Sequence, residues 1–167
     1  MPDQGETYTG FIEAELKAEH ERRGALDGRA AGIATTSSAF LALVFTVSAL
    51  VTGKDYRFTD WGARGAVLAL LLFAAAALSG LVATVAGRGY HVVSVPTLRD
   101  MVGSHWVDDE VDARNVTASS NVETIFDLRV GNNLKARLIV VGLGLQVAAT
   151  FVLICALGWE LKSFVLP

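Results

Sequence analysis

Three uncharged apolar segments constrain the fold of this chain more than any other feature. They run from Ala31 to Val51, from Gly65 to Gly87 and from Leu138 to Trp159. About twenty helical residues extend roughly 30 Å, which is the thickness of the hydrocarbon core of a bilayer. Hydrophobic residues make up 52% of the chain but aromatic residues only 8%, so the apolar content is mostly Ala, Val and Leu, a bias that suits helices. We therefore predict an all-α integral membrane protein with three transmembrane helices.

The positions of Lys and Arg predict the orientation of these helices. Basic residues near membrane spans are enriched on the cytoplasmic side, and here they are most numerous before the first apolar segment and between the second and third. We therefore place the N-terminal helix (1–30) and a helical insert (88–137) in the cytoplasm. The other predicted parts are the first transmembrane helix (31–51), an extracytoplasmic turn (52–64), the second transmembrane helix (65–87), the third transmembrane helix (138–159) and an extracytoplasmic tail (160–167).

Two helix starts are predicted within the insert. Pro96 favours the first turn of a short helix, because its missing N–H is not needed there. Ser104 is a predicted N-cap for a longer helix that leads into the third apolar segment. The polar stretch Ala118–Asn121 could break this longer helix, so the sequence leaves open whether it is one helix or two.

Three glycines recur every fourth residue where the chain enters the first apolar segment. Gly24, Gly28 and Gly32, followed by Thr36, lie on one face of a helix. In a membrane such a face lets a second helix approach closely. We expect this face to pack against the same helix of a second subunit, in a homo-oligomer, or against the third apolar segment. That segment has small residues of its own, namely Gly142, Gly144 and Ala148.

Charged and amide side chains cluster where the first and third apolar segments begin. They are Asp27, Arg29, Asn132, Lys135 and Arg137. If the helices pack together, these groups converge into a small site for an anionic ligand at the membrane edge. The alternative is that the cations snorkel to the interface and form ordinary ion pairs at helix ends. Spacing alone favours this second interpretation.

No pattern of catalytic or metal-binding residues is recognisable. The chain shows no Ser/His/Asp set, no paired buried carboxylates and no phosphate-binding loop. Its three histidines share no ligand spacing, and Cys155 is its single cysteine, so we expect no metal site, no cofactor and no internal disulfide. A net charge of −3 gives no indication of binding to nucleic acid. We therefore expect that the chain is not an enzyme.

Two short motifs resemble those of a known family. The first is "LDGRAAGI", with Asp27, Arg29 and Ala30, and the second is "NNLKARL", with Lys135; Pro96 lies where the family often has a proline. In these motifs and in its layout the chain resembles the transmembrane effectors of Pycsar bacterial anti-phage systems. The resemblance implies a multi-pass protein of the bacterial inner membrane, activated by cyclic UMP or cyclic CMP from a partner cyclase. It also implies that the protein contacts membrane lipids and that activation impairs the integrity of the membrane.

This chain departs from an effector that forms a permanent pore. Its apolar segments contain few polar residues, chiefly Gln146 and some hydroxyl groups. Disruption of the membrane by oligomeric assembly is therefore expected rather than conduction through an open channel. A second class of protein explains the same segments without a ligand, namely a small non-enzymatic scaffold or accessory subunit of a larger membrane complex.

Overall fold

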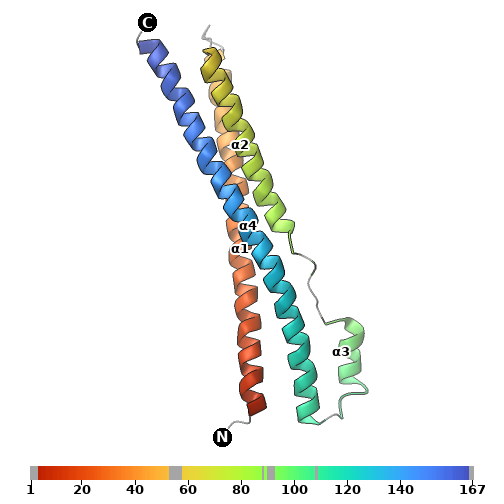
Figure 1. Cartoon of the computed structure of the whole chain (residues 1–167). Coiled ribbons are helices and arrows are strands. Elements are labelled where there is room, and N and C mark those ends of the chain that lie inside the picture. Colours follow the sequence, from red (N-terminus) through yellow and green to blue (C-terminus); the bar gives the residue numbers. More distant parts are fainter. Residues whose placement is uncertain (1–3, 53–57, 88, 90–92, 108, 166–167) are drawn as a thin grey trace. The chain divides into compact units, whose positions relative to one another are not determined.

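The protein is all-α in a computed structural model, which describes residues 4–52, 58–87, 89, 93–107 and 109–165. Within these residues four helices follow in order (Figure 1): α1 (Gln4–Thr52), α2 (Asp60–Val85), α3 (Val95–Val102) and α4 (Glu110–Val165). Among the described residues, α1, α2 and α4 are long and apolar enough to cross a membrane. The predicted fold class is thus confirmed, and the chain is compatible with a multi-pass membrane protein.

Two compact units make up the chain. We call Met1–Leu26 with Ala86–Leu134 the polar unit, and Asp27–Val85 with Lys135–Pro167 the membrane unit. Both α1 and α4 contribute residues to each unit. In the predicted turn, residues 53–57 lie outside the described part of the chain, as do residues 166–167 of the predicted tail and His91 of the insert.

Buried residues in the membrane unit recur at alternating intervals of three and four. On α2 this seam consists of Ala69, Phe73, Ala76, Gly80 and Ala83. A mean period of 3.5 residues is that of helices wound around one another in a left-handed supercoil. Most seam residues are small, which lets helix backbones approach closely where lipid provides no hydrophobic driving force.

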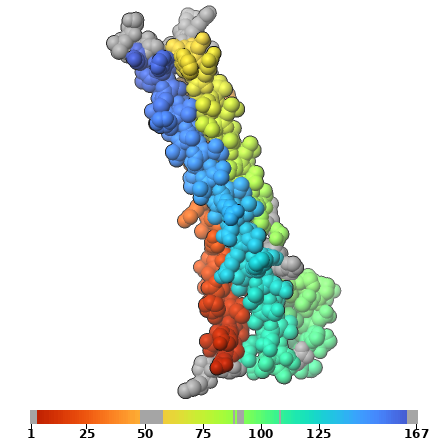
Figure 2. Space-filling view, viewed as in Figure 1, coloured from red at the N-terminus to blue at the C-terminus, as the bar shows by residue number. Residues whose placement is uncertain are grey.

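Contacts along the seam show that α2 runs antiparallel to α1 and α4. Near one end of α2, a Cβ on Gly65 would lie 2.7 Å from the Cβ of Ala156 in α4. Further along α2, Phe73 stacks on Phe40 of α1 with ring centroids 5.0 Å apart, and the Ser79 hydroxyl donates to the carbonyl of Leu138 at 2.8 Å. The space-filling view shows the later residues of α4 packed along α2 in this unit (Figure 2).

In the polar unit the first residues of α1 lie beside the first residues of α4 (Figure 2). Bonded side chains of the two helices are between 110 and 114 residues apart in sequence, so the helices run parallel. Apolar burial is limited here: within the described residues, the buried hydrophobic side chains of this unit are Leu26, Ile125 and Leu128. Helix α3 has no buried residue.

Helix caps in the insert confirm one predicted start and correct another. Helix α3 begins where Pro96 predicts, and Ser94 caps it by accepting a hydrogen bond from the backbone N–H of Thr97 at 3.2 Å. The prediction of Ser104 as an N-cap is wrong. Helix α4 begins later because the Asp109 carboxylate accepts from two backbone N–H groups of its first turn, each at 2.9 Å, whereas Ser104 lies in a turn.

Helix α4 then continues without interruption through the stretch predicted as a possible break. Residues Ala118–Asn121 are helical, so the second helix of the insert is a single helix that extends through the third apolar segment. Likewise α1 runs from the charged N-terminal sequence through the first apolar segment, as its lack of proline predicts. Nothing in either stretch removes a backbone donor, which is why both helices propagate.

Candidate functional site

Asp27 and Lys135 form an ion pair between α1 and α4 in the membrane unit. The Lys135 ammonium bonds to the Asp27 carboxylate; the lysine side chain is 1% exposed and the aspartate side chain 42%. An ammonium removed from water is strongly destabilising unless it is paired. The structure therefore brings together these two predicted site residues, and it uses Lys135 for an internal contact.

The two predicted arginines of the membrane unit are exposed. Arg29 on α1 and Arg137 on α4 each face outward, and neither forms a hydrogen bond or an ion pair with another described residue. Their guanidinium groups keep all their donors available. Arg29 and Arg137, rather than Lys135, are therefore the cations at these helix entries that are free for an anion.

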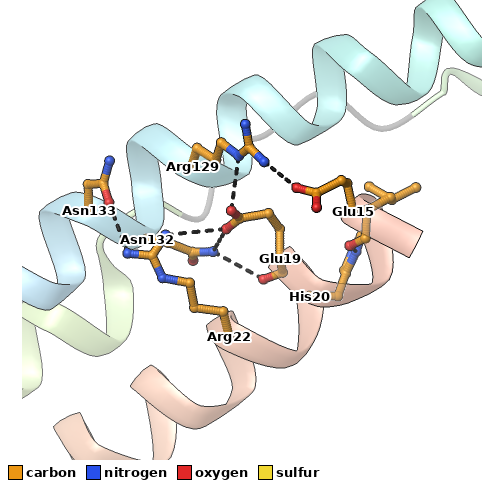
Figure 3. Close-up of polar contacts among 8 residues, drawn as sticks. Glu15, Glu19, His20, Arg22, Arg129, Asn132 and Asn133 are labelled. Atoms are coloured by element: carbon orange, nitrogen blue, oxygen red, sulfur yellow. Dashed lines mark hydrogen bonds and ion pairs between the residues drawn. The ribbon is translucent and has the colours of Figure 1, made fainter. Parts of the chain in front are cut away.

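Asn132, the fifth predicted site residue, belongs to the polar unit and is bonded to Glu19 (Figure 3). Its Nδ2 atom donates to the Glu19 backbone carbonyl at 3.1 Å and to the Glu19 carboxylate at 2.9 Å. The Asn132 side chain is fully buried, and its Oδ1 atom accepts no hydrogen bond from the described residues. The five predicted residues are therefore divided between the two units.

Two arginines complete the cluster around Glu19. Arg129 donates through Nε to the Glu19 carboxylate at 3.0 Å and through Nη2 to Glu15. Arg22 approaches the Glu19 carboxylate at 3.6 Å and donates to the amide oxygen of Asn133 at 3.0 Å. Figure 3 shows that these side chains link α1 to α4 through one central carboxylate. Glu15, Glu19, Arg22 and Arg129 are not recognisable as site residues from the sequence, because nothing local indicates which helix faces them.

Glu19 remains ionised in this environment. Burial raises the pKa of its carboxyl group, but hydrogen bonds from Asn132 and Arg129 and the charge of Arg22 lower it by more. The pKa of Glu19 therefore lies below that of an ordinary glutamate. The carboxylate is thus an anion that accepts hydrogen bonds from Arg129 and Asn132 of α4 and lies near the charge of Arg22 on α1.

Among the described residues, the three glycines of the predicted face are open, whereas Thr36 on the same face contacts α4. Added Cβ atoms at Gly24, Gly28 and Gly32 would each meet nothing within 4 Å. The hydroxyl of Thr36 donates to the carbonyl of Gly32 at 2.7 Å and accepts from Gln146 on α4 at 2.9 Å. Of the two expected partners, the third apolar segment does not lie on these glycines, and a second subunit stays a prediction.

The two glycines predicted for packing on α4 have different surroundings. A Cβ at Gly142 would lie 3.2 Å from the side chain of Ile33 on α1 and 3.5 Å from that of Ser79 on α2, so Gly142 is where the three helices meet. At Gly144, by contrast, a Cβ would meet nothing within 4 Å.

A buried carboxylate at the other end of the membrane unit was not predicted. The Oε1 atom of Glu160 on α4 accepts from the backbone N–H of Thr59 at 2.9 Å and from its hydroxyl at 2.7 Å, at the start of α2. A negative charge is favourable there, because a helix N-terminus carries partial positive charge. A Cβ at Gly62 would overlap this carboxylate, so a larger residue there would displace the Glu160 side chain from its position.

Neither side chains nor comparisons assign a reaction to the chain. Among the described residues, no group of three or more His, Cys, Asp or Glu side chains could hold a metal ion. Comparisons with protein-family models, with curated proteins and with solved structures found no match. The fold therefore identifies only the class of protein, namely an all-α chain that is compatible with a multi-pass membrane protein.

Proposed function

We propose that this chain is a non-enzymatic effector of a bacterial anti-phage system. In this proposal the N-terminus is cytoplasmic and the three apolar helices cross the inner membrane. A cyclic pyrimidine mononucleotide, cyclic UMP or cyclic CMP, is supplied by a partner cyclase and activates the protein. Assembly of several copies then impairs the integrity of the membrane.

The Asp27–Lys135 ion pair is the observation that carries the proposal. The two motifs that resemble the Pycsar effectors lie 108 residues apart, and their charged residues are bonded to each other. Each residue lies where its helix enters an apolar segment. Removing one partner of such a pair leaves a buried unpaired charge, at a cost of about 3–5 kcal/mol. This supports a role for both motifs in fixing the resting arrangement of α1 and α4.

The free cations supply a binding chemistry for the proposed ligand. A cyclic mononucleotide carries one phosphodiester anion, and arginine binds phosphate through two parallel N–H donors. Arg29 and Arg137 are exposed and have no partner among the described residues. We therefore assign contact with the phosphate to one or both of these arginines, and we assign to Lys135 the positioning of α4 against α1.

Assembly is the proposed mode of action because the apolar helices offer little for a permanent aqueous pore. In the described part of the membrane unit, Gln146 and scattered hydroxyl groups are the main polar side chains between the helix ends, and Gln146 is bonded to Thr36. The open face at Gly28 and Gly32 is a place where another helix can approach.

Membrane potential in bacteria that express the full chain tests this proposal. We expect depolarisation when cyclic UMP or cyclic CMP is supplied, and loss of the response in the double variant Arg29→Gln/Arg137→Gln. Lys162→Gln is the matched control, because Lys162 is an exposed cation at the other end of α4. Absence of depolarisation with every cyclic nucleotide would remove the proposal. Purification with a stoichiometric foreign protein would favour the accessory-subunit alternative.

A further inference from the structure

An open apolar groove runs between α2 and α4 at the end of the membrane unit where α2 begins. Its volume is about 410 Å³, and its lining, which is almost entirely apolar, includes Trp61 and Gly65 of α2 and Phe151, Cys155, Ala156 and Trp159 of α4. The small residues Gly65 and Ala156 form its floor, because a Cβ on Gly65 would lie 2.7 Å from the Cβ of Ala156. The larger, exposed side chains of both helices form its walls.

Two tryptophans indicate the depth of this groove in a bilayer. Trp61 and Trp159 are 68% and 52% exposed, and each lies at the end of an apolar stretch of its helix. Exposed tryptophan rings are favoured at the level of the lipid headgroups. From Trp159 the groove continues along α4 to Phe151, which is about 12 Å further into the apolar segment. Its mouth therefore lies at headgroup level, and the rest of it lies beside the acyl chains.

A guanidinium group lies at the mouth of the groove. Arg64 on α2 is exposed, and its Cζ atom lies 5.8 Å from the centre of the Trp61 ring. It forms no ion pair with another described residue: Glu160 is buried and accepts hydrogen bonds from Thr59, and Asp60 is not paired with it either. Arginine stacked on an aromatic ring keeps its N–H donors available, and two of them match two oxygens of a phosphate group.

We infer that this groove binds an anionic glycerophospholipid, with one acyl chain along its lining and the phosphate on Arg64. A free phosphate would leave the apolar lining unused, and a hydrocarbon without a headgroup would leave the arginine unused. A second copy docked symmetrically on this groove would bring two Arg64 side chains together, and like charges facing each other are unfavourable. The inference rests on the membrane placement in the proposed function and not on its cyclic nucleotide.

Quenching of tryptophan fluorescence by brominated lipids tests the inference on the full chain in vesicles. In a Trp106→Phe background both remaining tryptophans line the groove. Phosphatidylglycerol with brominated acyl chains competes there with unlabelled phosphatidylcholine, and the reverse pairing is measured as well. We expect phosphatidylglycerol to be preferred about two- to fivefold, the range of a partly exposed ion pair. In Arg64→Gln this preference should disappear.

Arg137→Gln is the matched control for the headgroup contact. Arg137 is also an exposed arginine with no partner among the described residues, and it lies at the other end of the apolar part of α4, away from both tryptophans. This variant should keep the preference for phosphatidylglycerol.

Substitutions of Cys155 test the acyl-chain contact separately. Cys155→Phe fills the groove and should reduce the preference, because a lipid that cannot seat its acyl chain cannot hold its phosphate at Arg64. Cys155→Ser is close to the native residue in size and should retain the preference. Cys155 is exposed, so the helical circular dichroism of both variants should equal that of the native chain.

Equal affinities in the native chain, or a preference that survives Arg64→Gln, would overturn the inference. Tryptophans that neither brominated lipid quenches would overturn it too, because protein would then cover the groove. A chain that does not float with the vesicles would reject the proposed membrane placement and the inference with it. A preference for phosphatidylglycerol without any effect of a cyclic nucleotide on membrane potential would support the inference and reject the proposed ligand.

Discussion

Replacing Gly80 by alanine tests how closely α1 and α2 pack in the membrane unit. A Cβ at Gly80 would lie 2.8 Å from the backbone oxygen of Ala30 and 2.9 Å from the backbone nitrogen of Ala34, whereas ordinary contact begins at 3.4 Å. Both atoms belong to a helix backbone, so neither can rotate away. We expect the helices to move apart by roughly 0.5–1 Å, which forfeits a quarter to a half of the dispersion energy of each contact across the seam.

Gly144→Ala is the matched control for this substitution. A Cβ at Gly144 meets nothing within 4 Å, so this variant shows only the gain in helix propensity, roughly 0.5–1 kcal/mol. Both variants share that gain, and overpacking should make Gly80→Ala less stable than Gly144→Ala by about 1–3 kcal/mol. Unfolding of the purified proteins in mixed micelles of rising SDS content, followed by circular dichroism, measures the difference. Equal midpoints would refute the close approach of α1 and α2.

The remaining predictions concern the three buried polar contacts. Because the pKa of Glu19 is lowered, its contribution to stability is complete above the ordinary glutamate pKa of about 4.3 and is lost as the pH falls through its lower pKa in the folded protein. In thermal melts, acid should therefore destabilise Glu19→Gln less than the native chain. Asp27→Ala should destabilise the micelle-bound protein by about 3–5 kcal/mol, and a second change, Lys135→Met, should recover most of this loss by removing the unpaired charge. Gly62→Ala should lower the SDS content at which half of the protein is unfolded. In a Glu160→Ala background the same substitution should have a smaller effect, because the added Cβ and the Glu160 side chain compete for one space.

Local sequence predicts the apolar helices well because the free energy of transferring a helix into lipid is a sum over neighbouring residues. Transfer into lipid depends on the composition of about twenty consecutive positions, so the segments that begin at Ala31, Gly65 and Leu138 are recognisable without knowledge of their partners. The start of α4 was harder to predict. Ser104 and Asp109 are both good N-caps, and the choice depends on the turn after α3 rather than on either residue alone.

Contacts between α1 and α4 were only partly predictable. Asp27 and Lys135 stand out because charges are rare next to apolar segments, and that signal is visible in the sequence. Glu19 lies among many other charges of the N-terminal helix, and nothing nearby distinguishes it from its exposed neighbours such as Glu21. Its importance arises from burial against Asn132, 113 residues away, and burial depends on which faces of the two helices meet.

The buried polar pair Glu19 and Asn132 explains how α1 and α4, whose buried positions recur with a regular period, adopt one register. A seam with a 3.5-residue period is nearly unchanged when one helix slides by seven residues. Such a slide would place Glu19 against Ile125 and Asn132 against Leu26, all four of which are buried positions. The carboxylate would then lose its donors, and an ionised group buried without partners is far more unfavourable than any apolar mismatch. Glu19 and Asn132 therefore contribute less to the strength of the α1–α4 contact than to its uniqueness, as single buried polar residues do in coiled coils.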